Sequence, residues 1–296
     1  MRSAVESGLN MIRSILLRMH LLMQKKPFRP VSGIPVYLLL ILSVLFLSHC
    51  VREFGSESFT EIRKHRFNIL FLGSSMTGWG MMPHQTRDVA LSLGDTLDMQ
   101  FHAIGGGTME MHTTNPRTLG MIAGTTWDYV VIETNPTLIA YPADQAARQI
   151  HPYALILDSL VHASSPEAEI VLYMPPAFKD GMPNRCVTDL GVCGCEEMQN
   201  RIAENILAVS DLLDAQVAPA GRVWQEVFAA DSTIDLHDVD RRHANFTGAY
   251  ATACTIYATI WKRELTGCLV PELISEETAM IIHSAVIDVV LNSGFL

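Results

Sequence analysis

The chain has 296 residues, of which 49% are hydrophobic and 18% are charged, and its formal net charge is -10. This length suits one large domain or two small ones. So apolar a composition excludes an intrinsically disordered chain, because enough apolar surface is present to build a sizeable core. The acidic balance argues against a nucleic-acid-binding surface, so no nucleic acid is expected among the partners.

Residues 1–50 differ in kind from the rest of the chain. A basic segment precedes an apolar run at residues 36–48, which closes at His49-Cys50. Such a pattern, with an apolar core of roughly 7–15 residues, is typical of a secretory signal, whereas a full membrane span needs about 20 apolar residues. We expect the basic flank to stay in the cytoplasm and everything after Cys50 to be exported, with residues 51–64 as a linker.

Residues 47–50 read Leu-Ser-His-Cys and resemble the lipobox of bacterial lipoproteins, with Cys50 as the residue that would be lipidated. His49 departs from the small residue that normally precedes that cysteine. Three interpretations therefore stay open: a lipoprotein signal, an uncleaved anchor and a simply cleaved signal. All three export the domain, and we expect it in the cell envelope, on the periplasmic or outer face. The first two make the membrane a partner of the N-terminal segment.

The remaining cysteines bear on disulfides and metals. An exported domain permits disulfides, and the spacing predicts a pair between Cys186 and either Cys193 or Cys195. Cys254 lies in an apolar helical pattern and is the natural candidate for a buried free thiol. The Cys-x-Cys spacing lacks the gap that zinc sites use, and no histidine lies nearby, so we expect no metal and no cofactor.

Strand-like and helix-like segments alternate along the chain. Buried or half-buried strands are predicted at residues 67–72, 99–104, 129–132, 169–173 and 216–218. Helical spacing covers residues 85–93, 144–162, 196–213, 222–228, 247–265 and 276–291, and residues 176–195 form a long irregular loop. This alternation predicts a single three-layer α/β/α domain over residues 65–296, with a central parallel sheet.

Polar and small residues follow the first three predicted strands. Ser74 and Ser75 follow the first strand, residues 105–107 are all glycine after the second, and Asn135 follows the third. Ligands bind outside the carboxyl ends of parallel strands, so a serine there is placed as a nucleophile. Glycine N–H groups and an asparagine side chain are donors that an oxyanion needs. The glycines and Asn135 before a proline also fit ordinary turns.

An acid and a histidine stand close together near the end of the chain. Asp240 precedes His243 by three residues, in a loop directly ahead of the predicted helix at 247–265. One turn can therefore present a base with a carboxylate beside it, which is the arrangement that nucleophilic catalysis needs. His237, with Asp235 or Asp238, offers a rival pairing, but the place before the helix favours Asp240 and His243.

Three of these segments together resemble the SGNH, or GDSL-type, hydrolases. Residues 73–77 (G-S-S-M-T) look like the first block of that superfamily, and residues 104–108 (I-G-G-G-T) look like the second. Residues 240–243 (D-R-R-H) resemble the fifth block. The blocks occur in family order, and the resemblance covers nearly all of residues 68–259.

The resemblance implies an SGNH/flavodoxin-like fold and a role for each matched residue. Ser75 falls on the nucleophile position, and Asp240 and His243 fall on the acid and the base. The oxyanion hole would be formed by the N–H groups of Ser75 and Gly106 and by the side chain of Asn135. This family chemistry uses no cofactor.

The sequence departs from the family pattern at three places. Ser74 stands where the name motif has aspartate, and Ala244 stands where proline usually follows the histidine. The third block normally reads Gly-x-Asn-Asp, whereas residues 133–136 read Glu-Thr-Asn-Pro. Asn135 is the expected second oxyanion donor, and Thr134 is the alternative.

Hydrophobic side chains also gather in the loops beside Ser75. Trp79 and several methionines lie there, and they fit either core filling or the wall of an apolar acyl pocket. For each of these side chains core filling is the favoured interpretation.

The sequence therefore predicts an exported serine esterase that acts on carboxylic esters. By analogy with the superfamily, the substrate is a small-molecule or carbohydrate ester, such as an acetyl ester on a polysaccharide. Two alternatives stay open: an acyltransferase that uses the same triad with a sugar hydroxyl as acceptor, and a membrane-tethered binding module with a degenerate site. The sequence predicts no oligomeric state.

Overall fold

The computed structural model describes residues 66–293. The predicted signal or anchor at 1–50, the linker at 51–64 and Cys50 lie outside these residues, so their assignments stay predictions. Within residues 66–293, no helix is both long enough and apolar enough to cross a bilayer.

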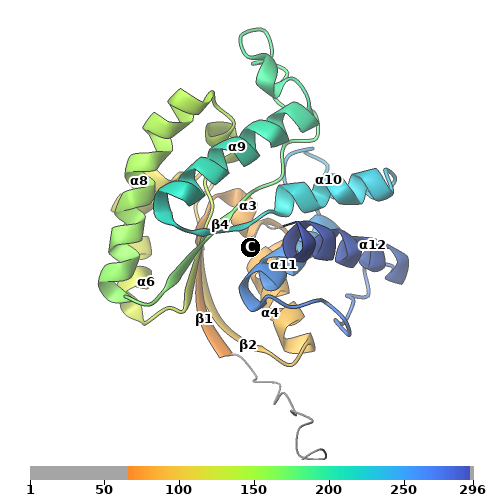
Figure 1. The fold of residues 1–296 in the computed structure, drawn as a ribbon, viewed down its shortest axis with the longest axis horizontal. Helices are drawn as coiled ribbons and strands as arrows, with labels where there is room; N and C mark the ends of the chain where they lie inside the picture. The colour runs from red at the N-terminus through yellow and green to blue at the C-terminus, as the bar shows by residue number, and fades with distance from the viewer. Residues whose placement is uncertain (1–65, 294–296) are drawn as a thin grey trace, which may run out of the picture. The chain divides into compact units, whose positions relative to one another are not determined.

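A five-stranded sheet lies at the centre of the described domain (Figure 1). Its strand order is β2-β1-β3-β4-β5, and every neighbouring pair is parallel. The strands are β1 (Arg66–Gly73), β2 (Thr96–Ala103), β3 (Tyr129–Ile132), β4 (Glu169–Tyr173) and β5 (Gln216–Ala218). After β1 the chain forms β2 on one side of β1, and β3, β4 and β5 then follow on its other side. The direction of strand addition therefore reverses between β1 and β3. Ligands of doubly wound folds bind at this switch point, beyond the carboxyl ends of the strands.

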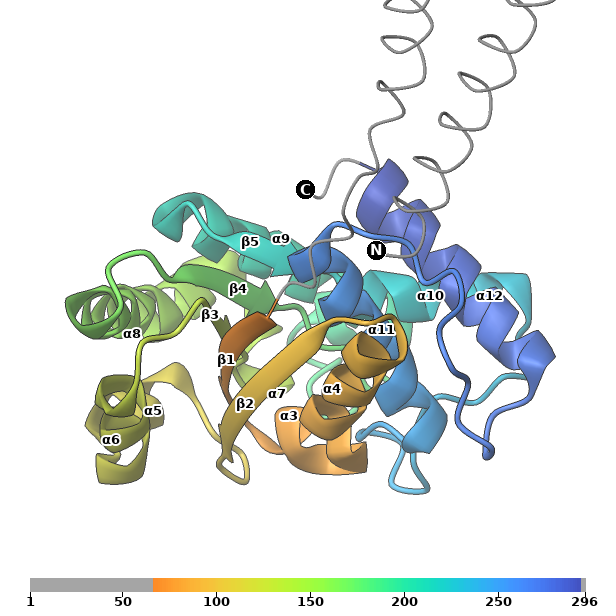
Figure 2. The same ribbon diagram turned by 90° about the horizontal axis from the view of Figure 1, so that it is seen from below.

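Helices cover both faces of the sheet and give two separate cores. Along β1, Ile69 and Phe71 belong to one core, whereas Leu70 and Leu72 belong to the other, because successive side chains of a strand point to opposite faces. The first face is covered by α4 (Met82–Ser92), α10 (Ala220–Ala230), α11 (Phe246–Trp261) and α12 (Glu276–Val286). The second is covered by α5 (Met109–Thr114), α6 (Pro116–Gly124), α8 (Ala143–Ser164) and α9 (Cys195–Leu213). Figure 2 shows α4, α11 and α12 on one side of the strands and α5, α6 and α8 on the other. The predicted three-layer architecture is confirmed.

Element boundaries differ from the prediction where the pattern is weak. β2 begins at Thr96 rather than at residue 99, because it is an edge strand whose polar residues Asp98 and Gln100 hide its start. α11 ends at Trp261 rather than at residue 265, since Lys262 adopts a left-handed conformation with φ of 53°. α12 ends at Val286, and a π-helical segment continues to Asn292.

The short helices after the glycine loop were not predicted. α5 and α6 are too short to show helical periodicity, but their capping residues are standard. The Thr108 side chain accepts a hydrogen bond from the N–H of Met111, and Asn115 caps the first turn of α6 ahead of Pro116. Three further short helices are α3 (Ser75–Gly78), η1 (Trp79–Met81) and α7 (Pro136–Ile139).

Candidate active site

The first component of the site is the turn between β1 and α3. β1 ends at Gly73 and α3 begins at Ser75, which places the half-buried Ser75 side chain at the switch point of the sheet. The turn is tightly packed around Gly73: a Cβ there would lie 2.1 Å from Thr77 Oγ1 and 2.6 Å from Glu133 Oε2. Glycine is therefore required at residue 73.

Ser75, His243 and Asp240 form one chain of hydrogen bonds. The Oγ of Ser75 lies 2.8 Å from Nε2 of His243, and Nδ1 of the same ring lies 2.5 Å from Oδ2 of Asp240. A carboxylate can only accept, so Nδ1 carries the proton and Nε2 is left to accept the serine hydroxyl. The structure thus brings together the three residues predicted from distant parts of the sequence.

Asp240 is held as an anion. Its Oδ1 accepts the backbone N–H groups of Arg242 and His243, each at 3.0 Å. Partial burial acts to raise the pKa of Asp240, but hydrogen bonds from the His243 side chain and from these two N–H groups prevail, and the pKa falls to about 2. At neutral pH this carboxylate is able to orient His243 and to stabilise its protonated form.

Trp79 contacts the histidine directly. Its ring stacks on His243 with a centroid separation of 4.4 Å and an interplanar angle of 18°. Its Nε1 donates to Oδ2 of Asp238 at 2.8 Å, and the side chain is 45% exposed. Trp79 therefore covers one face of the imidazole, a contact that could not be assigned from the sequence.

His237, the rival histidine, lies in the core. It is 4% exposed, and its Nε2 is hydrogen-bonded to the carbonyl oxygen of Ala177 at 3.0 Å. Burial lowers its pKa, so the neutral ring is favoured. Asp235 pairs with Lys179 at 2.6 Å instead of meeting the ring. The sequence-based preference for Asp240 and His243 agrees with this geometry.

The glycine loop packs against the nucleophile turn. The N–H of Ile104 donates to the carbonyl oxygen of Gly73 at 2.9 Å. A Cβ at Gly107 would lie 3.2 Å from that oxygen, so the loop approaches as closely as glycine allows. Gly106 has a φ of 66°, in the left-handed region that favours glycine, and it is exposed.

Asn135 lies beside Gly106. Its Nδ2 donates to the carbonyl oxygen of Gly106 at 3.3 Å, and its Oδ1 accepts the N–H of Thr137 at 2.9 Å. These contacts leave one hydrogen of the amide nitrogen for another acceptor. Thr134, the alternative donor, is 0% exposed, and its buried hydroxyl has no partner within the described part of the chain. The geometry favours Asn135.

A buried acid that the sequence did not indicate as functional lies beneath the turn. Glu133 is 0% exposed and accepts hydrogen bonds from the backbone N–H and the hydroxyl of Ser74 and from the hydroxyl of Thr77. Burial raises the pKa of Glu133 to about 7, although these hydrogen bonds oppose the rise. The available signal was a charged residue that directly follows a buried strand.

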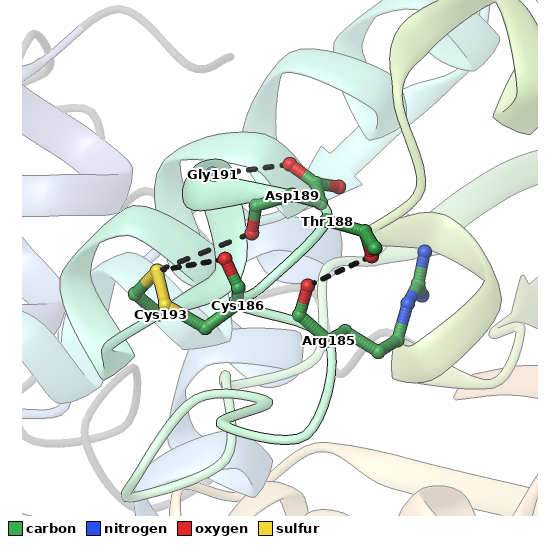
Figure 3. Close-up of a disulfide and its surroundings, with 6 residues drawn as sticks. All are labelled: Arg185, Cys186, Thr188, Asp189, Gly191 and Cys193. Atoms are coloured by element: carbon green, nitrogen blue, oxygen red, sulfur yellow. Dashed lines mark hydrogen bonds between the residues drawn. A yellow bond between two sulfur atoms is a disulfide. The ribbon is translucent and has the colours of Figure 1, made fainter.

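The irregular loop between β4 and α9 carries a disulfide. Cys186 and Cys193 are bonded (Figure 3), which selects one of the two predicted pairings. Cys195 and Cys268 are free, and Cys254 is the buried free thiol that was predicted. Figure 3 also shows hydrogen bonds within the loop, such as that from the N–H of Gly191 to Asp189. The loop is therefore held by local bonds and contains one short 3-10 helix, η2 (Leu190–Val192).

This loop supports the segment that carries the acid and the base. The N–H of Lys179 donates to the carbonyl oxygen of Arg241 at 2.9 Å, and the Arg241 guanidinium forms an ion pair with Asp180. Arg241 has a φ of 63°, a conformation that is uncommon for a residue with a side chain. Contacts with both its backbone and its side chain hold Arg241 there, between Asp240 and His243.

Among the residues described, no group of three or more His, Cys, Asp or Glu side chains is arranged to hold a metal ion. The polar groups that the structure brings together here are a serine hydroxyl, an imidazole, a carboxylate and amide donors, and acyl transfer uses such a set.

No protein-family model and no curated protein matches the sequence. Solved structures do match. One is a DUF4886 family protein from Bacteroides uniformis, at 16% identity and a TM-score of 0.64, covering 77% of this chain and 95% of that one. Another is a proposed SGNH hydrolase from Slackia heliotrinireducens, at 23% identity and a TM-score of 0.53, covering 66% of this chain and 100% of that one. An acetyl xylan esterase matches at 13% identity and a TM-score of 0.48, covering 65% of this chain and 99% of that one.

These similarities concern the arrangement of the chain in space. The chain has the fold of the SGNH hydrolases, as its sequence blocks predicted.

Proposed function

We propose that this protein is a serine hydrolase that cleaves carboxylic esters. The observation that carries the proposal is the chain of hydrogen bonds from Ser75 through His243 to Asp240 at the carboxyl end of the central strands. This arrangement supplies a nucleophile, a base that accepts its proton, and an acid that orients the base.

In the first half of the reaction, Ser75 Oγ attacks the ester carbonyl while Nε2 of His243 accepts the hydroxyl proton. The N–H groups of Ser75 and Gly106 and the Nδ2 of Asn135 stabilise the oxyanion that forms. His243 then gives the proton to the departing alcohol, which leaves an acyl-Ser75 intermediate. Water, activated by His243, attacks this ester and releases the carboxylic acid and free Ser75.

The proposed substrates are esters of small molecules or carbohydrates, with acetyl esters first among them, and the proposed location is the cell envelope. Two observations support export: the basic and apolar pattern of residues 1–50, and the disulfide between Cys186 and Cys193, because disulfides persist in oxidising compartments. Membrane attachment through residues 1–50 is part of the same proposal.

The full-length protein and its Ser75→Ala variant should be compared with a fluorophosphonate probe and with p-nitrophenyl acetate. We expect labelling and turnover in the wild type and neither in the variant. Peptide mapping should place the label on Ser75 and not on Ser74, since the Ser74 hydroxyl is buried against Glu133. A folded wild type that shows neither labelling nor turnover would reject the hydrolase and favour the degenerate binding module.

Product analysis separates the hydrolase from the acyltransferase. With an acceptor sugar added, a hydrolase still releases free carboxylic acid at an unchanged rate. Appearance of an acylated sugar at the expense of free acid would replace the proposal by its transferase alternative.

A further inference from the structure

Glu133 places a carboxylate directly under the nucleophile turn. It follows β3, and its two oxygens reach across to the first residues after β1. Oε2 accepts the backbone N–H of Ser74 at 2.6 Å and the hydroxyl of Thr77 at 3.0 Å, while Oε1 accepts the hydroxyl of Ser74 at 2.8 Å. Both ends of the Ser74–Thr77 turn are thus attached to one side chain, and Ser75 lies between them.

The hydrogen-bond pattern matches the ionised form of Glu133. The Ser74 hydroxyl already accepts the N–H of Met76 at 3.1 Å, which directs its own proton toward Glu133. The backbone N–H of Ser74 has a fixed direction and can only donate to Glu133. A carboxylate accepts all three bonds, whereas a carboxylic acid has to donate one and would meet a hydroxyl that is already donating. Protonation of Glu133 therefore deprives a hydroxyl hydrogen of the turn of its acceptor.

Only neutral groups stabilise this buried charge. Within residues 66–293 no basic side chain forms an ion pair with Glu133. Tyr173 of β4 lies near this charge. Burial is the larger cause that raises the pKa of its hydroxyl, and the negative charge of Glu133 is the second cause. From α5, the Nε2 of His112 is hydrogen-bonded to the carbonyl oxygen of Gly73 at 3.1 Å, and burial lowers the pKa of His112. Because the pKa of Glu133 rises to about 7, this carboxyl changes its charge near neutral pH.

Two departures from the SGNH pattern are in contact at this point. The first block has aspartate where this chain has Ser74, and the third block has glycine where this chain has Glu133. The Ser74 hydroxyl and the Glu133 carboxylate are hydrogen-bonded to each other.

We propose that Glu133, in its carboxylate form, is a positioning residue that holds the Ser74–Thr77 turn and so keeps the Ser75 hydroxyl at His243. Protonation of Glu133 releases the turn and lowers turnover. This inference rests on the proposed function, because it concerns the same nucleophile. Glu133 itself does not touch the substrate.

The pH profile of kcat/KM tests the proposal. His243 and Glu133 must both be unprotonated for full activity, so across these ionisations the logarithm of kcat/KM should fall with a slope that approaches 2 per pH unit in the wild type. Glu133→Gln removes one of them, and its slope should be 1. At pH 8 we expect kcat of Glu133→Gln to fall about 100-fold with KM within about twofold, since a misplacement of about 1 Å can cost roughly 100-fold.

Two further variants control for a loss of folding. Asp95→Asn alters another buried carboxylate, which precedes β2 and accepts hydrogen bonds from Tyr257 and Arg263. This variant should keep the slope of the wild type. Thr77→Val removes one donor to Glu133, and it should move the second ionisation to higher pH, because the carboxylate loses a hydrogen bond.

The proposal is overturned if the active wild type shows a slope of 1 and Thr77→Val leaves the profile unchanged. In that outcome the esterase assignment survives. Absence of both turnover and fluorophosphonate labelling in the folded wild type would reject the esterase and the positioning role together. An active Glu133→Gln variant with a slope of 2 would equally reject the positioning role alone.

Discussion

His243 and His237 lie in the same short stretch of chain, and each has an aspartate nearby, yet the structure gives them opposite surroundings. His243 is half-buried, and both of its ring nitrogens bond to side chains, those of Asp240 and Ser75. His237 is buried, and its Nε2 bonds to a backbone carbonyl oxygen. One ring is able to exchange protons with a reacting group, and the other is part of the core.

The difference arises from the backbone between the two histidines. Asp235 uses its carboxylate for the backbone N–H of His237 and for Lys179, so it never meets the imidazole. Asp240 is turned back toward His243 by the bend at Arg241, whose left-handed conformation is held by the disulfide loop. An acid and a histidine at this spacing meet here because the chain folds back on itself.

Substitution of the two histidines should give the largest contrast. His243→Ala removes the base, and we expect kcat to fall by about 10⁴–10⁶, as in other serine triads. His237→Gln keeps a donor for the Ala177 carbonyl oxygen, so its kcat should stay within about twofold. Turnover of p-nitrophenyl acetate measures both. Comparable losses in the two variants, with both folded, would contradict the assignment.

Substitution of Asp240 should lower kcat far more than substitution of Asp235. Asp240→Asn keeps the size of the side chain but removes the charge that fixes the tautomer, and a loss of about 10⁴ in kcat is expected from other triads. Asp235→Asn, which touches only Lys179 and a backbone N–H, serves as the matched control with kcat within about twofold. A fall of less than tenfold for Asp240→Asn would show that another group orients His243.

Substitution of Asn135 should lower kcat by an intermediate amount, and this loss does not depend on the two histidines or the two aspartates compared above. Asn135→Ala removes one oxyanion donor, which is expected to lower kcat by roughly 10²–10³ with His243 intact. Thr134→Val is the control, because the Thr134 hydroxyl is buried and without a partner among the residues described. If Thr134→Val had the larger effect on kcat, the oxyanion donor would have to be reassigned.

The smallest effects should appear in the pH dependence of stability. The pKa of His237 lies below its ordinary value of 6.5, so its neutral form contributes stability above that pH that is lost as the pH falls through the folded pKa. Asp240, with a pKa of about 2 against 3.8, contributes stability above pH 3.8 that is lost as the pH falls toward 2. Urea unfolding at several pH values should show His237→Gln flattening the first window and Asp240→Asn the second.

The fold and much of the site could be predicted from the sequence, because both are marked by local signals. Unbroken apolar runs such as residues 69–72 mark strands that are buried on both faces, and polar residues directly after them mark the site. Ser75, Asp240 and His243 followed from their places at the ends of elements. The start of the edge strand β2 was predicted at residue 99 instead of Thr96, because the polar residues at its start hide the strand pattern.

Contacts between distant segments could not be predicted in the same way. Trp79 fitted either core filling or a pocket wall, and only the fold brings it onto His243. Glu133 looked like a departure from a motif, and its partners Ser74 and Thr77 belong to another strand end. The choice between Cys193 and Cys195 as the partner of Cys186 depended on loop geometry, which spacing alone does not determine.

The stacking of Trp79 on His243 also provides an intrinsic optical reporter. An imidazolium ion quenches indole fluorescence more strongly than neutral imidazole, so the emission of Trp79 should follow the protonation of His243 without any substrate. Trp127, Trp224 and Trp261 are buried, at 3%, 2% and 6% exposure, and respond weakly to an aqueous quencher such as acrylamide, whereas Trp79 is 45% exposed. The acrylamide-sensitive part of the emission therefore gives a titration curve for one histidine in the resting protein.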